Sequence, residues 1–176
     1  SGRSIESYSM FEELVKCGDL MEQYGGHPMA AGLSIKEENV EEFRRRLNEN
    51  CTLTEKDLMP KIVIDVPMPV SYINKELVEE ISLLEPFGKG NTKPIFAQKG
   101  LRVLSSRVLG KNRNVAKLQL SDSTGCVMEA VYFGEADEFV NQVKNSSSIA
   151  VTYYPEINRY QGRETLQIVI RNYLTE

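Results

Sequence analysis

The feature that most constrains the fold is a series of strand-like segments that begins near Lys93. In the last of them, Leu166, Ile168 and Ile170 alternate with Gln167 and Val169. A period of two predicts strands that turn one face toward a core. The expected strands cover residues 94–108, 115–121, 126–133, 148–154 and 164–171, and a helix at about 135–143 separates the third from the fourth.

Three strands, a helix and two further strands is the order of an OB-fold, a five-stranded Greek-key barrel that commonly binds oligonucleotides. We expect the barrel proper at about 92–174. Residues 110–114 would form its first long loop and residues 157–163 its last hairpin loop. A strand at 61–66 precedes it, followed by a helix that Asn74 caps and Pro86 ends.

Residues 1–60 predict a separate small unit of helices and turns. Ser9 is a candidate N-cap for a first helix, and a short strand is expected at 33–35. A second helix would place Val40, Phe43 and Leu47 on one face. The expected fold class is therefore α+β, with domains at 1–60 and 61–176.

Charge is distributed unevenly along a chain whose net charge is −4. Residues 87–119 contain eight basic side chains and no acidic one: Lys89, Lys93, Lys99, Arg102, Arg107, Lys111, Arg113 and Lys117. Cations that neutralise phosphates release condensed counterions, so this stretch is a candidate nucleic-acid surface. The alternative interpretation is a solvated, lysine-rich face.

Composition excludes several other classes of protein. No run approaches the roughly 20 apolar residues of a membrane span, and no signal peptide precedes the first helix. Three distant cysteines and one histidine argue against a metal site and indicate a reducing cytoplasm. Because the chain opens at Ser1 without Met, we expect a piece of a longer protein.

Four local sequences together resemble the RecJ family of single-strand-specific exonucleases. They are Ser1-Gly2-Arg3-Ser4-Ile5, Gly25-Gly26-His27 with Met29-Ala30-Ala31-Gly32, Pro86-Phe87-Gly88-Lys89-Gly90-Asn91, and Asn158-Arg159-Tyr160-Gln161-Gly162-Arg163 before Leu166-Gln167. The resemblance covers the whole chain. It implies part of a DHH-associated domain, followed by the RecJ type of OB domain.

The resemblance also implies what this chain does within a larger enzyme. RecJ-like proteins degrade single-stranded DNA from 5′ to 3′ during DNA repair and recombination. They bind Mn²⁺ or Mg²⁺ in an N-terminal DHH domain that this chain lacks. Two-metal chemistry needs clustered carboxylates and imidazoles, so we expect a C-terminal fragment that binds single-stranded DNA, has no cofactor of its own and is inactive as a nuclease.

Two candidate sites follow from the family motifs and the charge pattern. The resemblance implies phosphate binding by Ser1, Arg3, Ser4, Gly25, Gly26 and His27, although a Gly-Gly turn with a backbone-satisfied histidine is the alternative. For the OB domain we expect DNA contacts from Lys89, Lys93, Arg102, Arg107, Lys111, Arg113, Lys117, Arg159, Tyr160 and Arg163. Of the pair Tyr153 and Tyr154, one must face the barrel core.

A protein-docking module is the alternative function, since an OB barrel has no obligation to bind nucleic acid. The same basic face could recruit an acidic peptide, such as the tail of a single-strand-binding protein.

Overall fold

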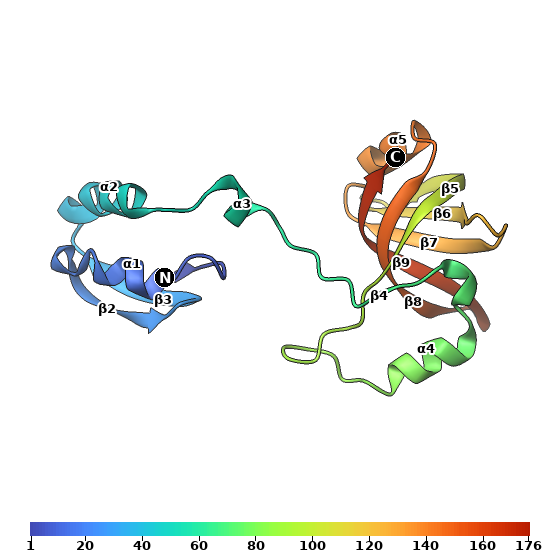
Figure 1. Ribbon diagram of the computed structural model, residues 1–176, viewed down its shortest axis with the longest axis horizontal. Helices are drawn as coiled ribbons and strands as arrows, with labels where there is room; N and C mark the ends of the chain where they lie inside the picture. Colours follow the sequence, from blue (N-terminus) through green and yellow to red (C-terminus); the bar gives the residue numbers. More distant parts are fainter. The chain divides into compact units, whose positions relative to one another are not determined.

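The computed structural model describes residues 1–176, which divide into two compact units, Ser1–Lys61 and Ile62–Glu176. The first contains three strands and three helices (Figure 1): β1 Gly2–Arg3, α1 Met10–Val15, β2 Met21–His27, β3 Ala30–Ile35, α2 Val40–Asn50 and α3 Glu55–Leu58.

The first unit is built on an antiparallel sheet with the order β1-β3-β2. Helix α1 begins where the Ser9 side chain accepts a hydrogen bond from the backbone N–H of Glu12, and it buries Leu14. The sequence did not predict β2. All of its residues after Met21 are exposed, so it has no alternating apolar pattern, and pairing with β3 defines it instead.

The second unit contains the strands expected from the C-terminal sequence pattern. Its elements are β4 Val66–Pro67, α4 Lys75–Ser82, β5 Phe96–Leu109, β6 Val115–Ser121, β7 Val127–Phe133, α5 Ala136–Lys144, β8 Ile149–Tyr160 and β9 Arg163–Thr175. The strand order is β4-β5-β6-β7-β9-β8, and an additional pairing of β5 with β8 closes β5 to β9 into a ring. The five-stranded ring confirms the predicted α+β class and OB-type architecture.

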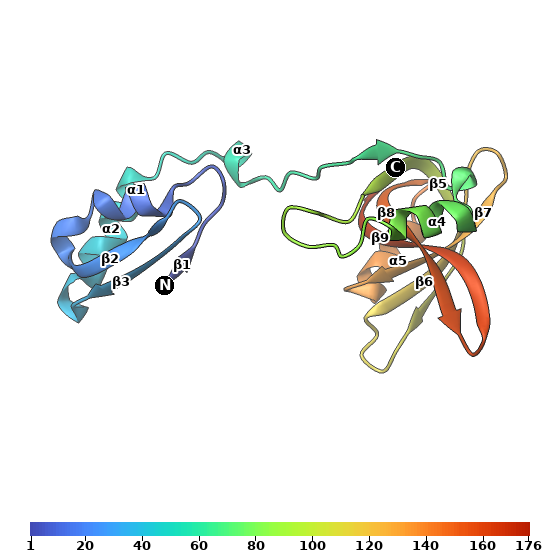
Figure 2. The same ribbon diagram turned by 90° about the horizontal axis from the view of Figure 1, so that it is seen from below.

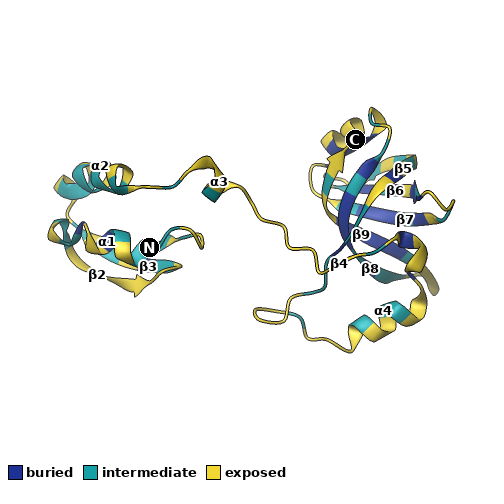
Figure 3. Cartoon of the chain, in the orientation of Figure 1, coloured by how far each residue is buried: buried dark blue, intermediate teal, exposed yellow.

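Helices α5 and α4 lie on different sides of the ring (Figure 1, Figure 2). Helix α5 buries Phe139 and Val143 in the core, where Phe139 packs against Tyr132 at 4.3 Å between ring centroids. The strands of the ring contain most of the buried residues of the unit (Figure 3). Helix α4 is capped by Asn74, as predicted, through a 2.8 Å bond from the Leu77 N–H to the Asn74 side chain.

Two expectations about the second unit were wrong in detail. Residues 62–65 are not a strand, and only β4 pairs with β5. The Asp65 carboxylate accepts from the Ile95 N–H, just before β5 begins. Ile62, Val63 and Ile64 upstream pair with no strand and are exposed.

The predicted loop at 157–163 is instead a continuation of two paired strands. Pairing of β8 with β9 extends to Tyr160 and Arg163. Gln161 and Gly162, with φ of 48° and 76°, form a two-residue turn, and positive φ at both positions suits the twist of a hairpin. This part of the hairpin does not pack on the core, so its residues are polar. The polar composition therefore indicated a loop, although the residues are paired as strands.

Candidate nucleic-acid interface

One row of residues crosses all five strands of the ring. Its members pair in register from β5 through β6, β7 and β9 to β8: Arg107 with Lys117, Lys117 with Val131, Val131 with Val169, and Val169 with Tyr154. We call these five residues the basic–aromatic row. With about 4.8 Å between neighbouring strands, the row is roughly 19 Å long.

The basic–aromatic row lies on the outer face of the ring. Side chains alternate along a strand, and the sequence neighbours of the row are core residues: Ala116, Leu118, Ala130, Ile168, Ile170 and Tyr153. Arg107 is exposed, and a hollow of about 260 Å³ lies beside Arg107 and Lys117. The row therefore has cations at one end and an aromatic ring at the other, while Val131 and Val169 between them are buried, at 7% and 2% exposure.

Tyr154 forms the aromatic end of the row, while Tyr153 faces the core. This confirms that one of the two tyrosines points inward, and the Tyr153 hydroxyl donates to the Met68 carbonyl at 2.6 Å. The Lys93 ammonium lies 3.8 Å from the centroid of the Tyr154 ring and 5.9 Å from that of Phe87. This cation–π contact adds a third cation to the row.

Acidic residues from elsewhere in the sequence neutralise part of the basic stretch. Arg113 donates two hydrogen bonds to Asp137 of α5, and its guanidinium holds the pKa of Asp137 below its usual value. Lys117 forms an ion pair with Glu129 of β7. Residues 87–119 contain no acidic residue, but in the folded chain acids from α5 and β7 lie against two of their cations.

The predicted hairpin residues lie at the tip of β8 and β9. Tyr160 is 68% exposed, as expected, and pairs across the turn with Arg163. Arg159 donates to Glu164 at 2.9 Å. Lys75 and, to a smaller extent, Arg159 bond the Glu164 carboxylate and lower its pKa to about 2.

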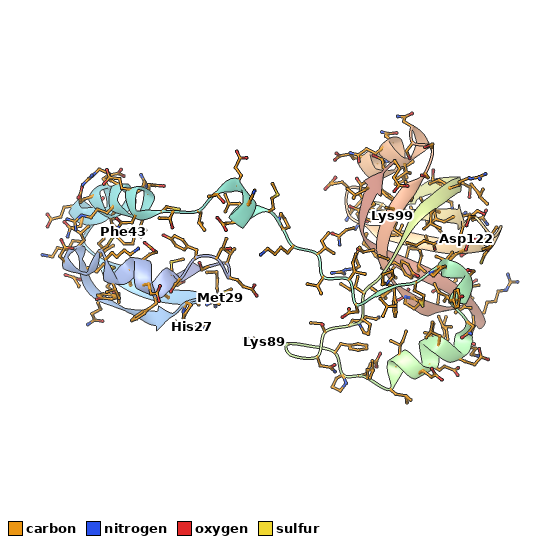
Figure 4. All side chains as sticks on the ribbon, viewed as in Figure 1. His27, Met29, Phe43, Lys89, Lys99 and Asp122 are labelled. Atoms are coloured by element: carbon orange, nitrogen blue, oxygen red, sulfur yellow. The ribbon has the colours of Figure 1, made fainter.

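The remaining predicted cations are exposed but scattered. Lys89 lies at the tip of the loop before β5 (Figure 4). Lys111 belongs to the loop between β5 and β6, next to the basic end of the row, whereas Arg102 pairs with Ser121 near the other end of β6. The structure thus places Arg107 and Lys117 side by side on the outer surface of the ring, with Lys111 in the adjoining loop. Lys93 lies at the other end of the row, beside Tyr154.

The two N-terminal family motifs meet on the sheet of the first unit. Arg3 of β1 and His27 of β2 both pair with Ala30 of β3, so the three residues form one line across the sheet. His27 and Met29 lie at the end of the β2–β3 hairpin (Figure 4). Arg3 and His27 are both exposed, so this end of the sheet offers two cationic or hydrogen-bonding groups.

Hydrogen bonds decide which groups at that end are available to a ligand. The Met29 N–H donates to Nδ1 of His27 at 3.2 Å, which leaves Nε2 as the outward N–H donor. The Ser4 hydroxyl donates to the Tyr8 carbonyl, so its single O–H donor is already used. Ser1 is exposed and makes no side-chain hydrogen bond.

The two glycines of the Gly-Gly-His motif are not equivalent. Gly26 has φ of +150°, and a Cβ there would come within 2.3 Å of the Ala30 oxygen and 2.5 Å of the Ala31 Cα. A Cβ on Gly25 would meet nothing within 4 Å. Gly26 is therefore required for the close approach of β2 to β3, whereas Gly25 leaves its surface open.

Sequence reasoning missed Phe133, at the end of β7. Its ring is 60% exposed and belongs to the outer face, because its neighbour Tyr132 packs inward against Phe139 and Tyr173. The alternation of Met128, Ala130 and Tyr132 was the available signal, since it assigns Phe133 to the opposite face.

Neither a metal centre nor a membrane-spanning helix is found. No group of three or more His, Cys, Asp or Glu side chains is arranged to hold a metal ion. None of the helices has the length and apolar character needed to cross a bilayer.

The closed five-stranded ring with its helix places this chain in the OB-fold class, preceded by a small sheet unit. Family models agree with both parts: the RecJ OB domain matches residues 64–172, and the DHHA1 domain matches residues 1–52. The chain belongs to the RecJ family.

Curated relatives extend the similarity over nearly the whole chain. It is 33% identical over 174 residues to the single-stranded-DNA-specific exonuclease RecJ of Bacillus subtilis (strain 168), covering 98% of this chain and 22% of that protein. It is 28% identical over 178 residues to the RecJ of Escherichia coli (strain K12), covering 98% of this chain and 30% of that protein. The chain thus spans less than a third of the length of these relatives.

A solved structure has the same fold. The crystal structure of RecJ in complex with Mg²⁺ from Thermus thermophilus superposes with a TM-score of 0.77 at 21% identity. The match covers 99% of this chain and 26% of that one.

Proposed function

We propose that this chain is the single-stranded-DNA-binding region of a RecJ-like, single-strand-specific 5′–3′ exonuclease that acts in DNA repair and recombination. The observation that carries the proposal is the basic–aromatic row. Arg107 and Lys117 would bind phosphates, and Tyr154 would stack a base once Lys93 moves from its ring to a phosphate. Such contacts do not read base edges, so binding should tolerate any sequence.

The catalytic site of the whole enzyme would lie outside this chain. The relative from Thermus thermophilus was solved with Mg²⁺ and with Mn²⁺, and a two-metal reaction needs a cluster of carboxylates and imidazoles. The side chains present here do not form such a cluster. Arg3 and His27 would hold a phosphate of the DNA near that site, with Ser1 and the open backbone at Gly25 beside them.

Fluorescence anisotropy with labelled oligo-dT tests the proposal on the full 176-residue chain. We expect weak binding, micromolar or weaker, that falls steeply as salt rises. The double variant Arg107→Glu, Lys111→Glu should bind at least tenfold more weakly. Absence of binding to oligo-dT, or binding that does not respond to salt, contradicts the proposal.

Docking of an acidic peptide is a second candidate function, and one apolar groove favours it. The groove has a volume of about 630 Å³, and Ile64, Met68 and Leu174 are among its lining residues, with the cation Lys99. A peptide whose apolar residues fill the groove and whose acid pairs with Lys99, such as the tail of a single-strand-binding protein, would fit there. The groove and the basic–aromatic row share no residue, so oligo-dT should not compete with such a peptide.

The chemical state of the cysteines fits this setting. All three thiols, Cys17, Cys51 and Cys126, are free, which is compatible with the cytoplasmic location that we propose for the parent enzyme.

A further inference from the structure

A second row of residues lies beside the basic–aromatic row and is apolar. Leu109 of β5 pairs with Val115 of β6, and Val115 pairs with Phe133 of β7. Each member is two residues along its strand from a member of the first row and is therefore on the same outer face. Phe133 is 60% exposed and Leu109 is 38% exposed, so the row is open to solvent.

Phe133 is exposed on a backbone that is held in place. The Gly134 N–H donates to the Asn114 carbonyl at 3.0 Å, which ties the end of β7 to the loop after β5. Gly134 has φ of +152°, a conformation that glycine adopts readily. On the other side, Tyr132 is fixed in the core by Phe139. The backbone at Phe133 is thus held in place on both sides, while most of the Phe133 side chain is exposed.

No partner ring covers this exposed side chain, and three cations belong to the neighbouring strand and its loop. Neither an aromatic pair nor a cation–π contact involves Phe133. Lys111 and Arg113 belong to the loop that joins Leu109 to Val115, and Lys117 is two residues beyond Val115 on the same strand face. Two of these cations are ion-paired, Arg113 with Asp137 of α5 and Lys117 with Glu129 of β7, whereas Lys111 forms no ion pair. A flat apolar ring among cations suits a nucleobase whose phosphates bind at either side.

We infer that Phe133, flanked by Val115 and Leu109, is a nucleobase-stacking subsite of the outer face. This inference rests on the proposed function and deepens it, because it names the ring on which a base of the single strand stacks. The Tyr154 ring is covered by Lys93 in the free chain, whereas the Phe133 ring is open and needs no rearrangement. Phe133 would therefore contribute more to initial binding than Tyr154.

Truncation at Phe133 tests the subsite. Phe133→Ala should weaken binding of the full chain to oligo-dT roughly 5- to 150-fold, the factor that corresponds to one lost base–aromatic stack. For an abasic oligonucleotide of equal length, Phe133→Ala should bind as tightly as the wild type, because this ligand has no base that could stack on Phe133. Tyr72→Ala is the matched control, because Tyr72 is 70% exposed in the 3-10 turn Val70–Tyr72, before the ring strands.

Two further variants separate stacking from simple apolar contact and from misfolding. Phe133→Leu keeps an apolar side chain without a ring and should bind like Phe133→Ala. Phe133→Trp should retain affinity, and because the chain contains no Trp, its fluorescence reports directly on position 133. Oligo-dT should quench that fluorescence, whereas Tyr72→Trp should show no quenching.

The outcomes distinguish this inference from the proposed function. Wild-type affinity of Phe133→Ala, together with weakened binding of Arg107→Glu, Lys111→Glu, overturns the stacking subsite and leaves the proposed function standing. Wild-type affinity of Phe133→Leu assigns the surface to an apolar contact and also overturns the subsite. Failure of every protein, wild type included, to bind oligo-dT overturns both.

Discussion

Removing the two cations of the basic–aromatic row should lower the salt dependence of DNA binding by a predictable amount. The outer surface of the ring offers four cations to phosphates: Lys93, Arg107, Lys111 and Lys117. For single strands the slope of log K against log salt is about −0.7 per phosphate neutralised, which gives roughly −2.8 for the wild type. The double variant Arg107→Ala, Lys117→Ala keeps two of the four, so its slope should be about −1.4.

These slopes can be measured by the anisotropy of labelled oligo-dT between about 50 and 200 mM salt, and each slope corresponds to a fold change in affinity over that range. A fourfold rise in salt should weaken the wild type about 50-fold and the double variant only about 7-fold. The matched control, Lys99→Ala, Lys144→Ala, removes the same charge at two exposed lysines outside the row. Its slope should stay near about −2.8.

Two results would refute this reasoning. If the double variant keeps the wild-type slope, the phosphates do not bind at the row. If the control pair lowers the slope equally, net charge rather than position governs binding.

Three further changes have effects that follow from local geometry. Gly26→Ala should destabilise the β2–β3 hairpin by about 2–4 kcal/mol through strain and overlap, whereas Gly25→Ala should cost less than about 1 kcal/mol, as read by amide hydrogen exchange of the hairpin. Glu129→Gln should remove the negative charge that competes with phosphate for Lys117 and so tighten oligo-dT binding about two- to fivefold; weaker binding would show that the ion pair orders the site. Asp122→Asn should cost about 1–3 kcal/mol at pH 7, because the buried carboxylate accepts bonds from the turn between β6 and β7. Bonds from Thr124 hold the pKa of Asp122 below its usual value. The stabilisation is therefore present above about pH 4 and is lost as pH falls through the lower pKa of the folded state. Denaturant titrations of the wild type and of Asp122→Asn should converge at that low pH.

Periodicity predicted the ring because one face of each strand forms the core, although β9 also buries Gln167 and Val169 of its other face. The alternation of Leu166, Ile168 and Ile170 with polar or outward residues survives in the structure, since those three side chains pack in or against the core. Strand β2 escaped prediction for the opposite reason. Its residues after Met21 are exposed, so backbone pairing rather than burial defines it, and pairing leaves no periodic signal in the sequence.

The candidate surface was predictable only in part, because strand register and not sequence proximity brings its members together. Residues 87–119 supply Arg107 and Lys117, but also Arg113, which Asp137 neutralises from α5. Val169 and Tyr154 join the row from strands that lie at the end of the chain. A one-residue shift of β7 against β6 would replace Val131 by a residue of the opposite face and break the row. The charge run therefore indicates that a phosphate-binding face exists, whereas the pairings decide which cations share it with an aromatic ring.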